Sequence, residues 1–128
     1  MSLEYKWGPG KNLENSYNSS TGEYRYINDK DSLVITKVLL NERDKKFLDS
    51  NADEQGFWNL PSFVANDKKD VETSKAMRYY MKFNYQKKSK EVTYLSDFDG
   101  NPKMKSAAAQ MQKIIEQSII DAEERAKK

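Results

Sequence analysis

The chain has 128 residues, 22 of them basic and 20 acidic, so it has room for one domain and carries a formal net charge of only +2. It contains neither cysteine nor histidine, which excludes disulfides, thiolate and imidazole metal ligands, and nucleophiles activated by histidine. We therefore predict that the protein is not an enzyme and has no catalytic residues, no cofactor and no metal site.

The compartment follows only in part from the sequence. No run of about 18 apolar residues is present and residues 1–20 lack the apolar core of a signal peptide, which predicts a soluble chain without a transmembrane segment. The start Met1-Ser2-Leu3 is also compatible with a mature domain whose leader has been removed. A periplasmic or cell-envelope location and a cytoplasmic one both stay open.

The N-terminal segment, residues 1–20, contains Gly8-Pro9-Gly10 and few regularly spaced apolar side chains. This composition is typical of a polar tail or linker. Ordered structure is expected to begin near Thr21, so that a single domain occupies residues 21–128.

A first β-hairpin is predicted over residues 22–40, where aromatic and β-branched residues flank the turn-forming run from Asn28 to Asp31. With the turn at Asp29-Lys30, Tyr26 faces Leu33 and Tyr24 faces Ile35. These four side chains would then share an apolar face, and Arg25 and Val34 would share the other.

A second hairpin follows from the strict alternation over residues 76–86. If Gln86 pairs with Glu91 across the lysine-rich turn, the apolar residues of both strands lie on one face. We expect one set of side chains on the first strand, Met77, Tyr79, Met81, Phe83 and Tyr85, to be more buried than the set on its other face, Arg78, Lys82 and Asn84.

Two helices complete the prediction. Asn41 occupies an N-cap position before an acidic first turn, and Gly56 is suited to end that helix. A second helix from about Lys103 to Ala126 carries an apolar stripe at helical spacing. The elements predict an α+β fold with two layers: a four-stranded, mainly antiparallel sheet in ββαββα order, with two helices packed on one face.

One acidic loop and several carboxylates are candidate chemical sites. The run from Asp97 to Asn101 resembles half of a calcium-binding EF-hand loop, but Ser106 replaces the bidentate Glu that should end such a loop. We therefore interpret it as a strand-to-helix turn. Asp97 paired with Asp99 or with Glu91 is the candidate for a carboxylate-based hydrolase, which requires a geometry that sequence does not define.

The candidate interaction surface has two parts. Phe57, Trp58 and Phe63 lie in an aperiodic apolar loop, where Trp58 either closes one end of the core, the interpretation we favour, or anchors a partner. Arg78, Tyr80 and Lys82 lie on the strand face away from the predicted core. That face would suit a weak nucleic-acid binder, but the small net charge and the absence of an RNP motif argue against nucleic acid as a partner.

Several segments together resemble small uncharacterised bacterial extracytoplasmic or lipoprotein domains. The resemblance covers roughly residues 20–120 and is carried by Gly22-Glu23-Tyr24-Arg25-Tyr26, Asn41-Glu42, the run from Gly56 to Pro61, the strand from Tyr79 to Tyr85 and the C-terminal helix. It implies a small non-enzymatic domain near the cell envelope and transfers no binding residue.

Function is thus inferred largely by elimination. We predict a non-catalytic protein-interaction or ligand-binding module of the bacterial cell envelope, with another protein as the expected kind of partner. A small carboxylate-based hydrolase or carbohydrate-active domain and a weak nucleic-acid binder are the alternatives.

Overall fold

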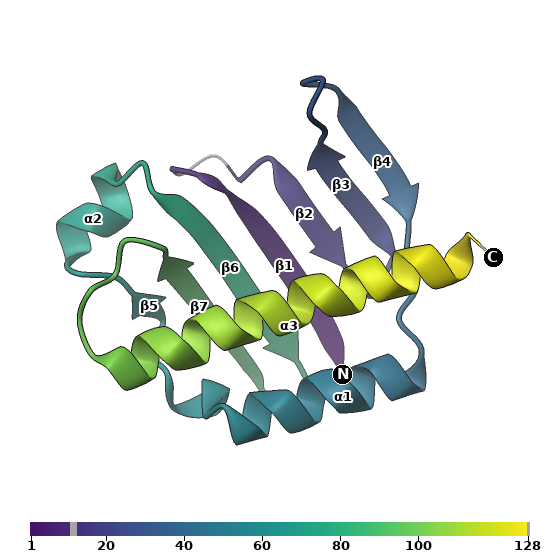
Figure 1. Cartoon of the computed structure of the whole chain (residues 1–128). Coiled ribbons are helices and arrows are strands. Elements are labelled where there is room, and N and C mark those ends of the chain that lie inside the picture. Colours follow the sequence, from purple (N-terminus) through teal and green to yellow (C-terminus); the bar gives the residue numbers. More distant parts are fainter. Residues whose placement is uncertain (11–12, 128) are drawn as a thin grey trace.

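The computed structural model describes residues 1–10 and 13–127, and within them seven strands form one mixed sheet in the order β4-β3-β2-β1-β6-β7-β5 (Figure 1). Neighbouring strands are antiparallel except β5 and β7, which are parallel. The bounds are β1 Ser2–Pro9, β2 Asn15–Asn18, β3 Glu23–Ile27, β4 Leu33–Lys37, α1 Glu42–Glu54, β5 Phe63–Val64, α2 Lys68–Thr73, β6 Met77–Asn84, β7 Ser89–Leu95 and α3 Pro102–Ala126.

The two longer helices, α1 and α3, lie side by side across the same face of this sheet, and the short α2 lies at its β5 end (Figure 1). The α+β class was therefore predicted correctly. The four-stranded sheet with two helices in ββαββα order was wrong. Among the described residues, no helix is long and apolar enough to span a membrane.

The largest correction concerns residues 1–20, which the sequence predicts to be a tail or linker. β1 lies between β2 and β6 and pairs with β6 from Ser2 to Pro9. Leu3 and Tyr5 are fully buried. Residues 3, 5 and 7 alternate as a strand requires, but the partner strand β6 lies far along the chain, so local pattern alone did not place β1 in the sheet.

The first hairpin exists, but its register differs from the prediction by one residue. The loop from residue 28 to 32 is longer than the expected turn: Asn28 accepts hydrogen bonds from the Lys30 and Ser32 amides, and Asp31 has a φ of 59°. Arg25 therefore pairs with Ile35. Because a shift of one residue exchanges the faces of a strand, Ile35 lies away from the helices and is 58% exposed.

The register of the second hairpin differs from the prediction by an even number of residues, so each side chain stays on the predicted face of the sheet. Met81 pairs with Val92 and Phe83 with Lys90, in place of the expected Phe83 with Tyr94. Met81, Phe83 and Val92 are all fully buried. The predicted order of burial fails at Arg78, which is only 6% exposed although it lies on the face away from α1 and α3.

The helix ends agree with the sequence prediction. Asn41 and Asp44 form a reciprocal capping box at the start of α1, and Gly56 adopts the left-handed conformation after its end. The Asn101 side chain caps the start of α3. Pro102 follows in the first turn of the helix, where proline is favoured because its missing N–H would have no partner within the helix. The stripe of α3 that faces the sheet is buried as predicted, and its members are Ala107, Ala108, Met111, Ile115, Ser118, Ile119 and Ala122.

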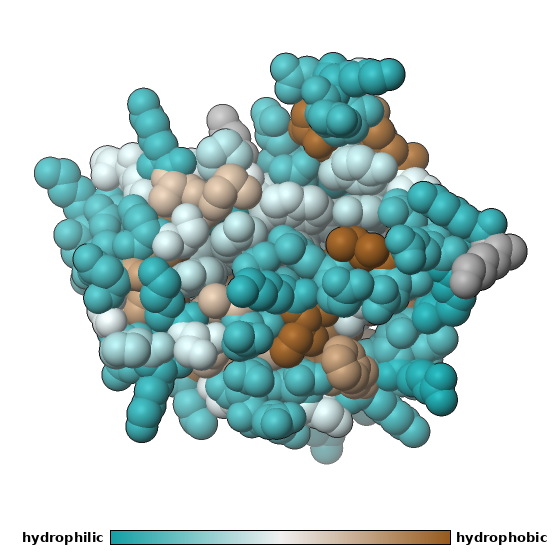
Figure 2. All heavy atoms as spheres, in the orientation of Figure 1, coloured by the Kyte–Doolittle hydropathy of each residue, from teal (hydrophilic) through white to brown (hydrophobic). Residues whose placement is uncertain are grey.

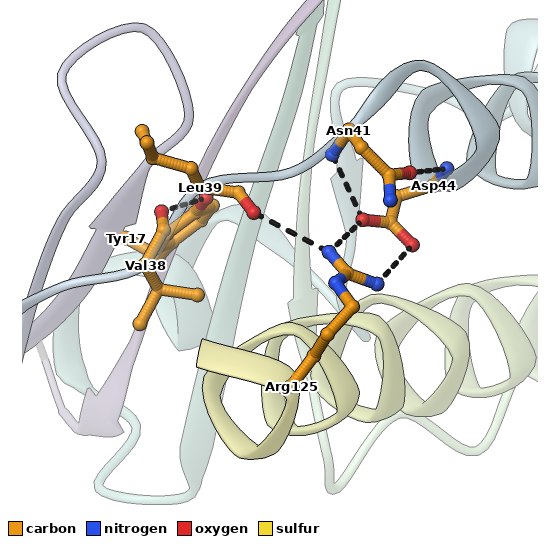
Figure 3. A network of polar contacts seen from close by, with 6 residues as sticks. All are labelled: Tyr17, Val38, Leu39, Asn41, Asp44 and Arg125. Carbon is orange, nitrogen blue, oxygen red and sulfur yellow. Dashed lines mark hydrogen bonds and ion pairs between the residues drawn. The ribbon is translucent and has the colours of Figure 1, made fainter. Parts of the chain in front are cut away.

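A polar network fastens the far end of α3 to the rest of the fold (Figure 3). Arg125 donates to both carboxylate oxygens of Asp44, at 2.7 and 3.4 Å, and reaches the Leu39 carbonyl at 3.5 Å. Nearby, the Tyr17 hydroxyl donates to the Val38 carbonyl at 2.7 Å. These contacts connect β2, the β4–α1 connection, the start of α1 and the end of α3, which fixes the position of α3 over the sheet.

Candidate functional site

A series of aromatic side chains crosses the helix-covered face of the sheet beside α3. Alternation along β1 puts Tyr5 and Trp7 on this face, and the register places Trp7 opposite Tyr79 of β6. Tyr24 of β3 continues the series from the other side. Trp7, Tyr24 and Tyr79 are only partly buried, although they pack against the core.

The rings form a connected array. The ring centroids of Tyr5 and Trp7 are 5.1 Å apart, and those of Trp7 and Tyr24 are 6.1 Å apart. Tyr26 extends the array at 4.8 Å from Tyr24. In Figure 2, pale surface of intermediate hydropathy lies above α3 over the strands, whereas the outer surface of the helix is mostly teal with isolated brown patches. Aromatic faces of this kind offer large, rigid contact areas to a ligand.

Between this array and α3 lies a crevice of about 220 Å³, which we call the aromatic crevice. Its sheet side is formed by Tyr5, Trp7 and Tyr24. Its helix side is formed by Glu116, Ile119 and Ile120, which share one side of α3 because they are three and four residues apart. Two aliphatic side chains and one carboxylate therefore face the aromatic rings.

Glu116 is fixed in the crevice by a hydrogen bond from the Tyr5 hydroxyl, at 2.6 Å to Oε1. Burial, and then Glu116, raise the pKa of Tyr5 far above its usual value. Burial also raises the pKa of Tyr24 to about 12, with further contributions from Glu123 and Glu116. The hydroxyls thus stay protonated at neutral pH, and negative charge acts on the crevice from α3.

No internal cation balances that charge in the part of the chain that the structure describes. Among those residues Glu116 forms no ion pair with a Lys or Arg, and its one hydrogen bond comes from Tyr5. Glu123, farther along α3, has Lys127 at 4.0 Å. The aromatic crevice therefore combines exposed π faces with an unpaired carboxylate.

The residues of the predicted interaction surface do not form one surface. Phe57 is fully buried, with its ring centroid 5.1 Å from that of Phe83. Trp58 is only partly buried and packs on Tyr85 at 5.3 Å, with the Lys88 Nζ 4.3 Å above its ring. Thus Phe57, rather than Trp58, closes this end of the core.

The other predicted site residues lie on the opposite face of the sheet. Phe63 is 52% exposed and pairs with Thr93, which in turn pairs with Tyr80. The Tyr80 hydroxyl donates to Glu91 at 2.6 Å. Lys82 stands between Glu91 and Glu4 in the register, so acidic and basic residues alternate. This row of the face is therefore mixed in charge, and the absence of a nucleic-acid partner stays a prediction.

Arg78 lies on the same side of the sheet, opposite Gly8 and Leu95. Its Nε and one Nη nitrogen are buried and have no hydrogen-bond partner among the described residues. Arg78 is thus too enclosed to serve as an exposed contact, contrary to its place in the predicted surface.

The acidic loop serves the local backbone. The Asp97 carboxylate accepts a hydrogen bond from Ser74 Oγ at 3.0 Å, and Asn66 bridges the Asp97 carbonyl and the Asp99 amide. Asn101 caps α3 through its side chain. In the described residues, no group of three or more acidic side chains is arranged to hold a metal ion. The absence of a calcium site stays a prediction for experiment.

A larger concavity, about 510 Å³, lies between α1 and α3. Phe47 is its one aromatic residue and is 53% exposed. Its rim carries both signs of charge, with Arg43 and Lys113 beside Asp121, so neither charge nor ring stacking selects one kind of ligand there. We therefore regard the aromatic crevice, although smaller, as the better candidate site.

Comparison with models of known protein families and with curated protein sequences finds nothing that matches this chain. The site must therefore be argued from its own geometry. Sequence reasoning missed the site, because it places Tyr5 and Trp7 in a tail or linker and gives Glu116 no role. The available signal was the alternation of Leu3, Tyr5 and Trp7.

Proposed function

We propose that this protein is a non-catalytic binding module and that its ligand site is the aromatic crevice between α3 and strands β1 and β3. The observation that carries the proposal is the series of partly exposed rings, Trp7, Tyr24 and Tyr79, beside a crevice that also contains the fixed carboxylate of Glu116. Apolar pockets with a few well-placed polar groups are the usual form of a small-ligand site.

Three features of the crevice support binding over a purely structural role. Trp and Tyr are enriched among residues that dominate binding energies. Glu116 is held by Tyr5 from a different element, so its position is set before any ligand arrives, which reduces the ordering cost of binding. Ile119 and Ile120 provide an aliphatic wall opposite the rings.

A location at the bacterial cell envelope is a separate part of the proposal. It is supported by the sequence resemblance alone. Fractionation of the native host, with detection of the chain in envelope, periplasmic and cytoplasmic fractions, tests it, and recovery from the cytoplasm alone would contradict it.

The binding site itself can be tested by NMR with ¹⁵N-labelled protein and a panel of small neutral, cationic, anionic and saccharide probes. We expect chemical-shift changes to cluster at the Trp7 indole N–H and at the amides of Tyr24 and Glu116. Trp58→Phe leaves a single indole signal for assignment. Changes that cluster around Phe47 in the α1–α3 concavity, or no changes with any probe, would contradict the proposal.

A further inference from the structure

We infer that the aromatic crevice recognises a cationic group, an ammonium or guanidinium attached to apolar carbon. This inference rests on the proposed function, because it names the chemistry of the ligand for the same site.

The first step is charge. Among the described residues that line the crevice, Glu116 is the one carboxylate or base, beside the protonated hydroxyls of Tyr5 and Tyr24. Its effect reaches Tyr5, Tyr24 and Tyr79, since it contributes to the raised pKa of each of them after burial. A phosphate or carboxylate ligand would be repelled here, whereas a cation would supply the missing opposite charge.

The second step is the π surface. A cation within about 6 Å of an aromatic centroid is attracted by the ring quadrupole, most strongly by Trp. Trp7 and Tyr24, whose centroids are 6.1 Å apart, offer two such rings on one side of the crevice. Ile119 and Ile120 on the other side would contact the carbon atoms that carry the charge.

The third step is a comparison within the molecule. Three rings elsewhere in the fold already have an internal cation: Lys88 lies 4.3 Å from the ring centroid of Trp58 and 5.5 Å from that of Tyr85, and Lys6 lies 5.7 Å from that of Tyr80. In the described part of the chain, no Lys or Arg lies over Trp7 or Tyr24 in this way. These rings are therefore free to accept a cation from a ligand.

The same chemistry can come from a free quaternary ammonium compound or from a Lys or Arg side chain of a partner protein. Choline represents the first source, and n-butylammonium and n-butylguanidinium represent the second. The neutral control is 3,3-dimethylbutan-1-ol, which has nearly the shape of choline and lacks its charge. Glucose tests the carbohydrate alternative, in which stacking on the rings would need no cation.

The experiment is an NMR titration of the full chain with these five probes, followed at the Trp7 indole N–H. We expect at least one cation to bind about tenfold more tightly than the neutral alcohol. Glu116→Gln should remove most of that preference. Glu124→Gln, an exposed acid near the end of the same helix, should keep it. Tighter binding of choline or of the butyl cations identifies the source.

The outcomes separate the inference from the proposed function. Equal binding of choline and the alcohol at the Trp7 signal, unaffected by Glu116→Gln, would overturn cation recognition and leave the crevice as a binding site. Preferential binding of glucose at the same signal would do likewise. No shift at Trp7 with any of the probes, together with shifts elsewhere on the protein, would overturn both.

Discussion

The Tyr5 hydroxyl and the Glu116 carboxylate, 111 residues apart in the chain, meet at 2.6 Å between the central strand and the long helix. The contact joins the two main layers of the fold and fixes the single carboxylate of the aromatic crevice. Structure and proposed function therefore depend on the same pair of residues. Variants of this pair are expected to affect both.

Tyr5→Phe should lower the free energy of unfolding by about 2 kcal/mol, because the ring stays in place while a hydrogen bond to a charged group is lost. Tyr79→Phe is the matched control, since the Tyr79 hydroxyl makes no hydrogen bond with any described residue. Urea unfolding at pH 7 measures both. Equal effects of the two variants would show that the Tyr5–Glu116 bond contributes nothing specific.

The Asp44–Arg125 contact predicts part of the pH dependence of stability. Burial acts to raise the pKa of Asp44, but hydrogen bonds from Arg125 and from the Asn41 amide outweigh it and hold the pKa below its ordinary 3.8. A carboxyl with a lowered pKa in the folded state adds stability above its unfolded pKa. That contribution is lost as the pH falls through the folded value.

Asp44→Asn should therefore be less stable than the parent protein at pH 7, and the difference should shrink as the pH is lowered below about 4. Denaturant unfolding at a series of pH values gives the comparison. Glu54→Gln changes an exposed residue at the end of α1 and is the control. Its free energy of unfolding should equal that of the parent protein at every pH. A constant difference between Asp44→Asn and the parent would refute the role of this ionisation.

The different burial of Phe57 and Trp58 predicts which of the two rings stabilises the core. Phe57→Ala removes a fully buried ring and should cost about 3–5 kcal/mol. Trp58→Ala should cost less, because its ring is partly exposed and rests on Tyr85 and Lys88 at the surface. Thermal and urea unfolding rank the two variants. A larger loss for Trp58→Ala would restore it as the residue that closes the core.

Two glycines with positive φ offer a matched test of backbone strain. Gly56 has a φ of 73° and open space around the position of a Cβ, so Gly56→Ala should cost only the conformational penalty of about 1–2 kcal/mol. Gly22 has a φ of 79°, and a Cβ there would lie 2.8 Å from Leu39 Cδ2. The Val38 carbonyl oxygen, a backbone atom, would also lie 3.2 Å from that Cβ, so Gly22→Ala should be the more destabilising variant. The reverse order would contradict the close packing of Gly22 against Val38 and Leu39.

Local signals in the sequence predicted the two longer helices, α1 and α3, but not the short α2. Asn41, Gly56 and Asn101 each act on the few residues next to them, so their effects on helix ends can be recognised without the rest of the fold. The alternation around Met81 and Phe83 likewise predicted the buried face of β6. The cross-strand partners differ from the prediction by an even number of residues, which leaves the face of each side chain unchanged.

The errors arose where partners are distant or a loop has one more residue than expected. β1 pairs with β6, and nothing in residues 1–20 identifies that partner. One additional loop residue near Asp31 reversed the faces of Leu33 and Ile35. The candidate site was lost for the first reason, because its walls come from β1, β3 and α3 and meet only in the folded chain.

The most direct measurement is a crystal structure of the protein with bromocholine, a quaternary ammonium ion that carries an anomalous scatterer. We expect a bromine anomalous peak in the aromatic crevice, with the ammonium carbon atoms against the rings of Trp7 and Tyr24 and the Glu116 carboxylate nearby, and a much weaker peak in crystals of Glu116→Gln soaked at the same concentration. A peak in the α1–α3 concavity beside Phe47, or an equal peak in the variant, would contradict it.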